Sequence, residues 1–273
     1  MKNLKLKNKI FLAPMEEIND VAFRLLCKDA GAGLTWTGMI HPRGKQEIDL
    51  DDKPILQLFC TSTEGIKEFM KKHDLKVSGW DFNLGCPAKT AKKHGFGSYL
   101  KDLEVIEEIM KTIRASTKKP FSVKIRKSKD AFKILKLAEK YCDWICVHPR
   151  TQGQGYGGEA DLNYGLEFKK KSKIPVIYSG DVKNLEEAKE RLKQFDYVMI
   201  GRGAIGIPSV FGGEKKSFKD YLEVAKKYKL PFRQLKFQAM SFSKGIRGGA
   251  EIRRNIAKMK SLKELRDYLN SKI

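Results

Sequence analysis

The sequence contains no apolar run approaching 18 residues, so we expect no transmembrane helix and no membrane partner. The stretch 1–9 is charged and has no long apolar segment behind it, which argues against a secretory signal. Hydrophobic residues still make up 41% of the 273 residues, enough for a sizeable core and too many for a disordered chain. The length allows one large domain, alone or with a small one. We expect a folded, cytoplasmic protein.

Cysteine is scarce and shows no pairing pattern. The five cysteines are an odd number in a long chain, so we expect reduced thiols rather than a disulfide framework. Cys142 and Cys146 lie four residues apart, but no histidine is near them and no second cysteine pair exists. We therefore expect both thiols to be buried, and we predict no metal site.

Acidic residues are outnumbered, with 33 Asp and Glu against 55 Lys and Arg, which gives a net charge of +22. Such a charge attracts polyanions. Only 12 of the 55 basic residues are arginine, and a lysine-rich surface is also typical of genome bias or a thermophilic source. Residues 214–273 carry 17 basic and 6 acidic side chains, a net +11. The charge is therefore concentrated at the end of the chain.

Short apolar, β-branched or aromatic runs recur along the first 200 residues, as is typical of strands. The eight runs are 10–13, 34–37, 55–59, 77–82, 121–125, 144–147, 176–178 and 197–200. The helical patterns between them are 19–31, 63–73, 102–115, 130–140 and 184–193. This alternation indicates parallel strands with helical crossovers, and eight units favour an α/β fold of the closed (β/α)8 (TIM) barrel type. An open, doubly wound sheet is the alternative.

The alternation stops near residue 213, and residues 214–273 read as helix throughout. The helix start and stop signals there are Pro231, Gly245, Gly248 and a capping box at Ser261 and Glu264. We therefore predict a catalytic barrel domain at 1–213, followed by a small, basic, all-helical domain at 214–273.

Polar or glycine-rich features accompany seven of the eight predicted strands. They are Pro14-Met15-Glu16, Gln57, Asn83 to Cys86, Lys124 with Arg126, His148 with Arg150, Ser179-Gly180-Asp181 and Gly201-Arg202-Gly203. In a β/α barrel, catalytic residues lie at the carboxyl ends of the strands. Together these residues therefore describe one site.

The stretch 201–206 matches the dinucleotide pattern G-x-G-x-x-G. We reject that interpretation, because no second strand follows and a ribose-binding acid has no place. Phosphate binding explains the stretch better: glycine amides and a following helix N-terminus approach the anion, and Arg202 adds charge. Ser179, Gly180 and Asp181 suit the same phosphate site, and two ordinary glycine turns are the alternative.

Four further side chains have a functional interpretation, and we weigh it against a purely structural one. Lys124, inside an apolar strand, is either a cation beside an anionic cofactor or part of a structural ion pair. Gln57 can offer its amide to a planar heterocycle, and the strand-end position of His148 favours function over core packing. Cys86 lies in a basic, glycine-marked loop that could act as a lid, and cations that approach it closely would lower its pKa. An incidental loop cysteine is the alternative.

Motifs in order along residues 10–211 closely resemble the tRNA-dihydrouridine synthases, in a short, archaeal-type form. The motifs are Ala13 to Glu16, Asn83 to Lys89, Gly95 to Gly97, Lys124 to Arg126, His148 to Thr151, Gln154 to Tyr156 with Ala160-Asp161, Ser179 to Asp181 and Gly201 to Gly203. Phe242 to Gly245 and Ala250 to Arg254 look like the helical RNA-binding domain of that family.

The resemblance implies FMN in the barrel, NADPH or NADH as reductant, and reduction of specific uridines in tRNA to 5,6-dihydrouridine. It implies hydride transfer from flavin N5 to uracil C6, with Cys86 as the general acid that protonates C5. The implied cofactor-binding residues are Pro14, Met15, Glu16, Gln57, Lys124, His148, Ser179, Gly180, Asp181, Gly201 and Arg202. The implied substrate-binding residues are Asn83, Lys89, Arg126, Arg150, Lys244 and Arg253. We expect a monomer whose partner is tRNA.

Two other functions stay open at this point. An FMN barrel that reduces a small molecule, as a dihydroorotate dehydrogenase does, shares the predicted barrel and phosphate site but leaves the basic tail unexplained. An RNA-binding barrel without catalysis explains the charge equally well. The presence of Cys86, Asn83, Lys124 and His148 argues against that second alternative.

Overall fold

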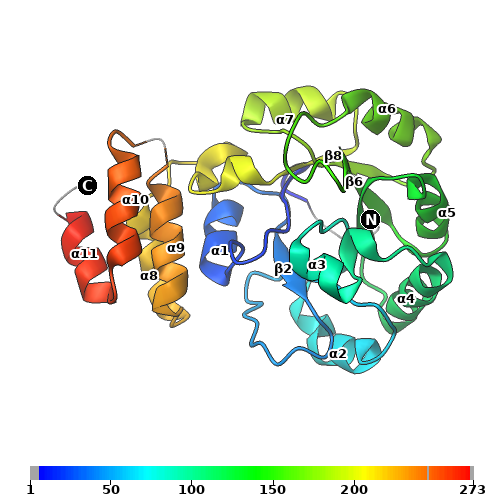
Figure 1. The fold of residues 1–273 in the computed structure, drawn as a ribbon, viewed down its shortest axis with the longest axis horizontal. Coiled ribbons are helices and arrows are strands. Elements are labelled where there is room, and N and C mark those ends of the chain that lie inside the picture. Colours follow the sequence, from blue (N-terminus) through cyan, green and yellow to red (C-terminus); the bar gives the residue numbers. More distant parts are fainter. Residues whose placement is uncertain (1–5, 245, 271–273) are drawn as a thin grey trace.

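The structure, a computed structural model, describes residues 6–244 and 246–270, and its first two hundred residues wind into a ring of strands (Figure 1). The strands are β1 (Ile10–Leu12), β2 (Trp36–Ile40), β3 (Ile55–Leu58), β4 (Gly79–Leu84), β5 (Phe121–Lys127), β6 (Trp144–Thr151), β7 (Val176–Tyr178) and β8 (Tyr197–Ile200). All pair in parallel in the order β1-β8-β7-β6-β5-β4-β3-β2. An isolated bridge between Leu12 and Thr35 joins the two ends. The predicted (β/α)8 barrel is confirmed, and the open-sheet alternative is wrong.

Helices cover the outside of the barrel. They are α1 (Val21–Asp29), α2 (Ile66–His73), α4 (Leu103–Ser116), α5 (Ala131–Tyr141), α6 (Leu162–Lys171) and α7 (Leu185–Leu192), while the short α3 (Lys89–His94) lies in front of the ring in Figure 1. The described residues also form four 3-10 turns: η1 (Asp74–Lys76) after α2, η2 (Gly97–Tyr99) after α3, and η3 (Arg202–Ala204) and η4 (Pro208–Phe211) after β8. Asp102 caps α4 by accepting the amides of Glu104 and Val105, and the apolar stripe of that helix is buried.

The structure differs from the sequence prediction where strands end. β4 and β6 run further than predicted, so Asn83, His148 and Arg150 lie within strands rather than after them. Pairing with β5 explains this extension, since Asn83 faces Lys124 and His148 faces Arg126 in the ladder. Such ladder hydrogen bonds outweigh the local preference of polar residues for loops. Residues 89–94, predicted as a flexible loop, form α3.

An apolar plug fills the lower part of the barrel interior. Because side chains alternate along a strand, residues such as Phe11, Trp36, Trp144 and Met199 face inward. The rings of Phe11 and Tyr197 stack at 5.2 Å. Above this plug, the inward positions toward the carboxyl end of the barrel are polar, and a ligand can enter there.

Residues after 213 form four helices, as the sequence predicted, and lie beside α1 (Figure 1). They are α8 (Phe218–Lys227), α9 (Phe232–Phe242), α10 (Gly249–Lys258) and α11 (Leu262–Asn270). The predicted signals lie at their ends: Pro231 precedes α9, Gly248 precedes α10, and the Ser261 hydroxyl accepts the Glu264 amide. Gly245 lies outside the described residues. No helix in the described ranges is long and apolar enough to cross a membrane.

A half-buried carboxylate joins the helical region to the barrel. Asp20 caps α1 through the amide of Phe23, and its Oδ2 accepts hydrogen bonds from Tyr221, Gln234 and Gln238 at 3.1, 2.7 and 3.0 Å. We call the side chains of Asp20, Tyr221, Gln234 and Gln238 the Asp20 cluster. Tyr221 and Gln238 are fully buried, and burial raises the pKa of Asp20. The cluster therefore fixes how the helices sit on the loop that follows β1.

We expect Asp20→Ala to lower the free energy of unfolding by about 3 kcal/mol or more, because it removes a helix cap and leaves buried donors without an acceptor. Urea denaturation measures this change. Arg233→Ala is the control: it breaks an exposed ion pair with Glu17 in the same contact and should cost no more than about 1 kcal/mol. Equal losses in the two variants would contradict this role of Asp20.

Candidate functional site

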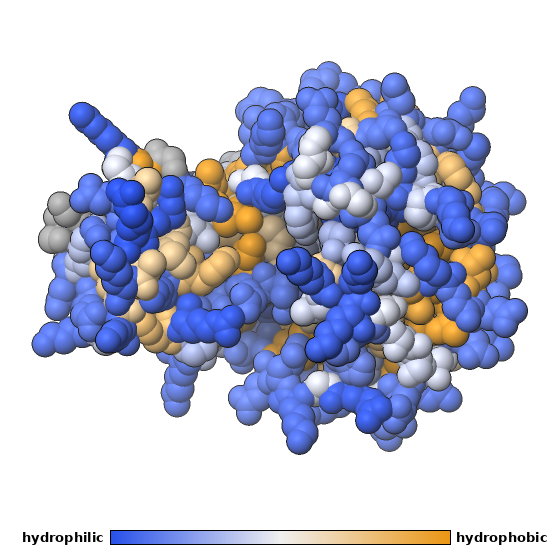
Figure 2. Space-filling model, in the orientation of Figure 1, coloured by the Kyte–Doolittle hydropathy of each residue, from blue (hydrophilic) through white to orange (hydrophobic). Residues whose placement is uncertain are grey.

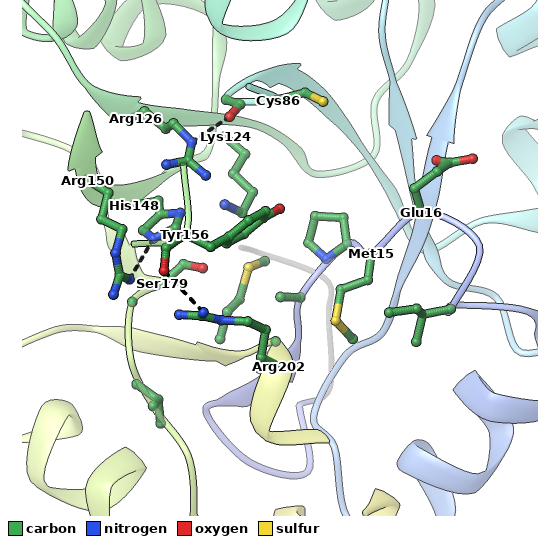
Figure 3. Close-up of a pocket in the computed structure, with 18 of the residues that line it drawn as sticks. Met15, Glu16, Cys86, Lys124, Arg126, His148, Arg150, Tyr156, Ser179 and Arg202 are labelled. Carbon is green, nitrogen blue, oxygen red and sulfur yellow. Dashed lines mark hydrogen bonds between the residues drawn. The ribbon is translucent and has the colours of Figure 1, made fainter. Parts of the chain in front are cut away.

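A cavity of about 630 Å³ opens at the carboxyl ends of the strands. The predicted site residues that line it are Pro14, Met15, Glu16, Gln57, Asn83, Cys86, Lys124, Arg126, His148, Arg150, Ser179, Gly180, Asp181, Gly201 and Arg202. Figure 3 shows Lys124 and Tyr156 extending toward the middle of this cavity, with Met15 and Glu16 across from them. A volume of this size is typical of cofactor and ligand sites.

Three of the predicted substrate-binding residues lie outside the cavity. Lys89 is exposed at the first turn of α3, which rises beside the cavity mouth. Lys244 is exposed just after α9, and Arg253 lies on α10, where its guanidinium donates to the carbonyl of Ser243. The structure therefore divides the predicted residues between the barrel mouth and the helical region.

A buried hydrogen-bond chain crosses the floor of the cavity. Asp81 accepts from Gln57 Nε2 at 2.5 Å and also from the hydroxyl of Ser122. Gln57 Oε1 in turn accepts from Asn83 Nδ2 at 2.8 Å. Since an amide has a distinct donor and acceptor end, the carboxylate of Asp81 sets the orientation of both amides.

This chain ends at Cys86. Asn83 Oδ1 accepts the backbone amides of Gly85 and Cys86 at 3.1 and 3.0 Å. From the other side, the hydroxyl of Ser98 donates to the Cys86 carbonyl at 2.8 Å. Gly97, with φ of +62°, packs so closely that a Cβ there would lie 2.9 Å from the Cβ of Cys86. The thiol is therefore held on a rigid segment rather than on a mobile loop.

Burial raises the pKa of the Cys86 thiol above its ordinary value, and Arg126 and Lys124 lower it by less. The nearby cations therefore lower this pKa, as expected, but loss of solvent outweighs their attraction and the net shift is upward. Cys86 is a protonated thiol at neutral pH. The other four cysteines are fully buried, Cys142 and Cys146 among them.

The cavity wall is rich in cations. Lys124 acts electrostatically on Asp81, but no hydrogen bond or ion pair holds its ammonium group within the described part of the chain. Burial and the charges of Lys124, Arg126, Arg150 and Arg202 lower the pKa of His148 to about 2. Arg150 can only donate, so at 3.3 Å it leaves Nε2 of the neutral imidazole as acceptor and the proton on Nδ1.

Asp181 is the carboxylate nearest these arginines. It pairs with Arg150 at 2.6 Å and with Arg202 at 3.0 Å, and it accepts the amide of Ala160. Its pKa is lowered because these hydrogen bonds and charges outweigh its burial. Asp181 therefore orients two guanidinium groups at the cavity wall.

The segment after β8 differs from its prediction in one respect. No α-helix follows Gly201 directly; residues 202–204 form the short 3-10 turn η3, so the predicted helix dipole at this point is wrong. The space beside the Cα of Gly201 is open, since a Cβ there would meet nothing closer than 3.6 Å. The glycine leaves room at the cavity wall that packing within the chain does not need.

Sequence analysis missed two residues of the site. Tyr156 lines the cavity between Arg126 and Arg202, each of whose guanidinium carbons lies 5.3 Å from the ring centre. Only its place in a motif could have pointed to it. Asp81 lies between Trp80 and Phe82 in a buried strand, and a carboxylate in such a setting is a signal that sequence analysis could have used.

The chain is similar to known proteins along almost its whole length. A family model described as "Dihydrouridine synthase (Dus)" matches residues 11–272. A Rickettsia conorii protein described as "Probable tRNA-dihydrouridine synthase" is 36% identical over 76% of this chain and 69% of its own. "tRNA-dihydrouridine synthase B" of Pasteurella multocida is 32% identical over 76% of this chain and 69% of its own.

Solved structures are similar in fold. Morphinone reductase in complex with tetrahydroNAD superposes with a TM-score of 0.54 and 10% identity, over 79% of this chain and 90% of its own. The old yellow enzyme homologue from Zymomonas mobilis superposes with a TM-score of 0.55 and 13% identity, over 79% of this chain and 92% of its own. At these identities the likeness shows the fold alone.

Asp81 should make stability depend on pH. Burial raises its pKa to about 7, so the folded state binds a proton that the unfolded state releases at lower pH. The wild type should therefore lose stability relative to Asp81→Asn as pH rises towards 7, by several kcal/mol at most at about 1.4 kcal/mol per pKa unit. Urea denaturation at pH 5 and pH 8 measures the gap.

Asp102→Asn is the matched control, because asparagine also caps a helix and the site is exposed. The difference between that variant and the wild type should be the same at both pH values. A gap between wild type and Asp81→Asn that does not change with pH would show that Asp81 is not a raised-pKa acid.

Proposed function

Because the chain belongs to the dihydrouridine synthase family, we propose that it reduces specific uridines in tRNA to 5,6-dihydrouridine, with FMN as cofactor and NADPH or NADH as reductant. The observation that carries this proposal is the position of Cys86. A protonated thiol on a rigid segment lies at the rim of a cationic cavity of cofactor size.

The cavity suits an anionic flavin at both of its ends. Met15 and Met39 offer apolar surface to a flat ring, and Lys124 presents an ammonium group that lacks an ion-pair partner among the described residues. We assign Pro14, Met15, Glu16 and Gln57 to contact with the ring system. Lys124 and the Nδ1 proton of His148 would hold its polar edge.

The phosphate end would lie at the segments after β7 and β8, as in many barrels of this kind. Ser179, Gly180 and Gly201 offer backbone groups and space, and Arg202 offers charge. Asp181 would act through the two arginines that it orients, since its own carboxylate repels a phosphate. The chemistry that FMN supplies when bound is hydride transfer, taken from the reduced nicotinamide and passed on to C6 of the uracil.

Cys86 would donate the proton that C5 of the uracil needs. Its raised pKa keeps the thiol protonated through the neutral range, which is the state that a general acid requires. Asn83 would contact the base and, through its Oδ1, hold the amide of Cys86 in place. Arg126 donates to the carbonyl of Gly85 at 2.8 Å and so holds the segment before Cys86 while lining the cavity.

The substrate base must leave its stack to reach this cavity, at a cost of a few kcal/mol. Phosphate contacts offset such a cost. Lys244 and Arg253 would supply them on the helical region, and Lys89 at the cavity mouth. The division of the chain into a catalytic part at 1–213 and an RNA-binding part at 214–273 stays a prediction, as does a monomeric state.

Replacing the proton donor should separate the two half-reactions. In Cys86→Ala, dihydrouridine formation in tRNA should fall about 100-fold or more, the usual contribution of a general acid. Reduction of the bound flavin by NADPH should be unchanged, because that step does not use the thiol. Cys142→Ala is the control, since it removes a buried thiol away from the cavity. Wild-type turnover by Cys86→Ala would exclude the thiol as the acid.

Reversing a charge on the helical region should weaken RNA binding. In Lys244→Glu, affinity for unmodified tRNA should fall, and the slope of log affinity against log salt should decrease by about 1 or more. The control is Lys111→Glu on α4, on the far side of the barrel from the helical region (Figure 1). Filter binding at several salt concentrations measures both. The same loss in the two variants would show a non-specific charge effect.

A further inference from the structure

A second cavity, of about 560 Å³, adjoins the first. The two share Glu16 and Met39, whose backbone amide donates to Glu16 Oε2 at 2.9 Å, so this carboxylate forms part of the wall between them. The remaining lining residues come from the segment after β2, the end of β3 and α3; they are His41, Gln46, Phe59, Cys60, Thr61, Thr90, His94 and Phe96.

The lining of this second cavity suits a planar heterocycle. The rings of Phe59 and Phe96 lie 4.3 Å apart, and the imidazole of His41 stands edge-on to Phe59 at 5.3 Å. His41 Nδ1 accepts the amide of Arg43, which places the proton of the neutral ring on Nε2 as a donor. Burial and Arg43 lower the pKa of His41, so the ring is neutral at physiological pH. Phe96 is buried against Phe59, whereas Phe59 is half-buried and lines the cavity, and exposed aromatic surface of this kind binds nucleobases regardless of their sequence.

Cations stand at the edge of the second cavity. Thr90 and His94 of α3 line it, and the same helix carries Lys89, Lys92 and Lys93, all exposed, and no acidic residue. The surface around α3 is strongly hydrophilic in Figure 2. Lysines beside an aromatic cavity match a nucleotide, with the base in the cavity and the phosphate at its edge.

Resting on the proposed function, we propose that the second cavity binds the nucleobase next to the target uridine in the substrate tRNA. With the cofactor and the target base both in the first cavity, of about 630 Å³, the neighbouring nucleotide would lie outside it. The strand is continuous, and the second cavity is the adjoining space with aromatic walls and cations. Recognition of single-stranded RNA by stacking of splayed bases is general.

The test fills the cavity from exposed positions that lie outside the proposed reaction chemistry. In Thr61→Trp and Thr90→Trp, kcat/KM for unmodified tRNA should fall about tenfold, as expected for loss of one stacked base. Flavin reduction by NADPH should stay within about twofold of wild type, and it also reports that the variants fold. Thr112→Trp on α4, away from both cavities, is the control and should behave as wild type.

A second measurement identifies the occupant. Once the modified uridine has been mapped by mass spectrometry, tRNAs with an abasic residue immediately 5′ or 3′ of it are compared with intact tRNA. With the wild-type enzyme, kcat/KM for one of the two abasic tRNAs should be about tenfold below that for intact tRNA. With Thr61→Trp, the same abasic tRNA should give no further loss relative to intact tRNA.

Independent losses from the abasic residue and the filling variant would overturn the inference, as would full activity of the filled variants. A loss confined to NADPH-driven flavin reduction would also overturn it and would assign the cavity to the dinucleotide. Wild type that forms no dihydrouridine in any tRNA would instead refute the proposed function itself.

Discussion

The hydrogen bond between the Asp81 carboxylate and Gln57 Nε2 is the interaction on which the site depends. It fixes which end of the Gln57 amide faces Asn83, and through Asn83 it fixes the backbone at Cys86. A buried carboxylate is costly, and its raised pKa reflects that cost. In return, the side-chain amides of Gln57 and Asn83 each take one orientation, which a floor of apolar residues cannot impose.

Charged residues gather higher in the barrel, above this floor. Below the floor, aromatic residues exclude water; above it, Lys124, Arg126, Arg150 and Arg202 face a space in which Asp181 and Glu16 are the nearby carboxylates. These crowded cations repel one another and disfavour the protonated form of His148. A bound anion would relieve that repulsion. The barrel mouth is therefore prepared for a negatively charged ligand, and Cys86 at its rim stays protonated for the same reason that His148 stays neutral: burial disfavours the charged form.

One short segment links this chemistry to the helical region. Met15 and Glu16 line the cavity, while Glu17 and Asp20, within five residues, bind α9. The Asp20 cluster therefore holds the basic helices at a fixed distance from the barrel mouth. If RNA binds both parts, as proposed, it has to span that distance, which would favour one position in a folded substrate.

The sequence by itself determined the alternation of eight strands with helices, the helical tail and the residues at the strand ends, because periodicity, capping and turn residues act locally. Only the tertiary structure determined which of those residues contact one another and how their pKa values shift. Pairing with β5 drew Asn83 and His148 into strands, and burial outweighed the lowering of the Cys86 pKa by nearby cations. Asp81 and Tyr156 gained their roles from neighbours distant in the chain. Burial, ladder pairing and charge crowding depend on residues far apart in sequence, so local patterns do not contain them.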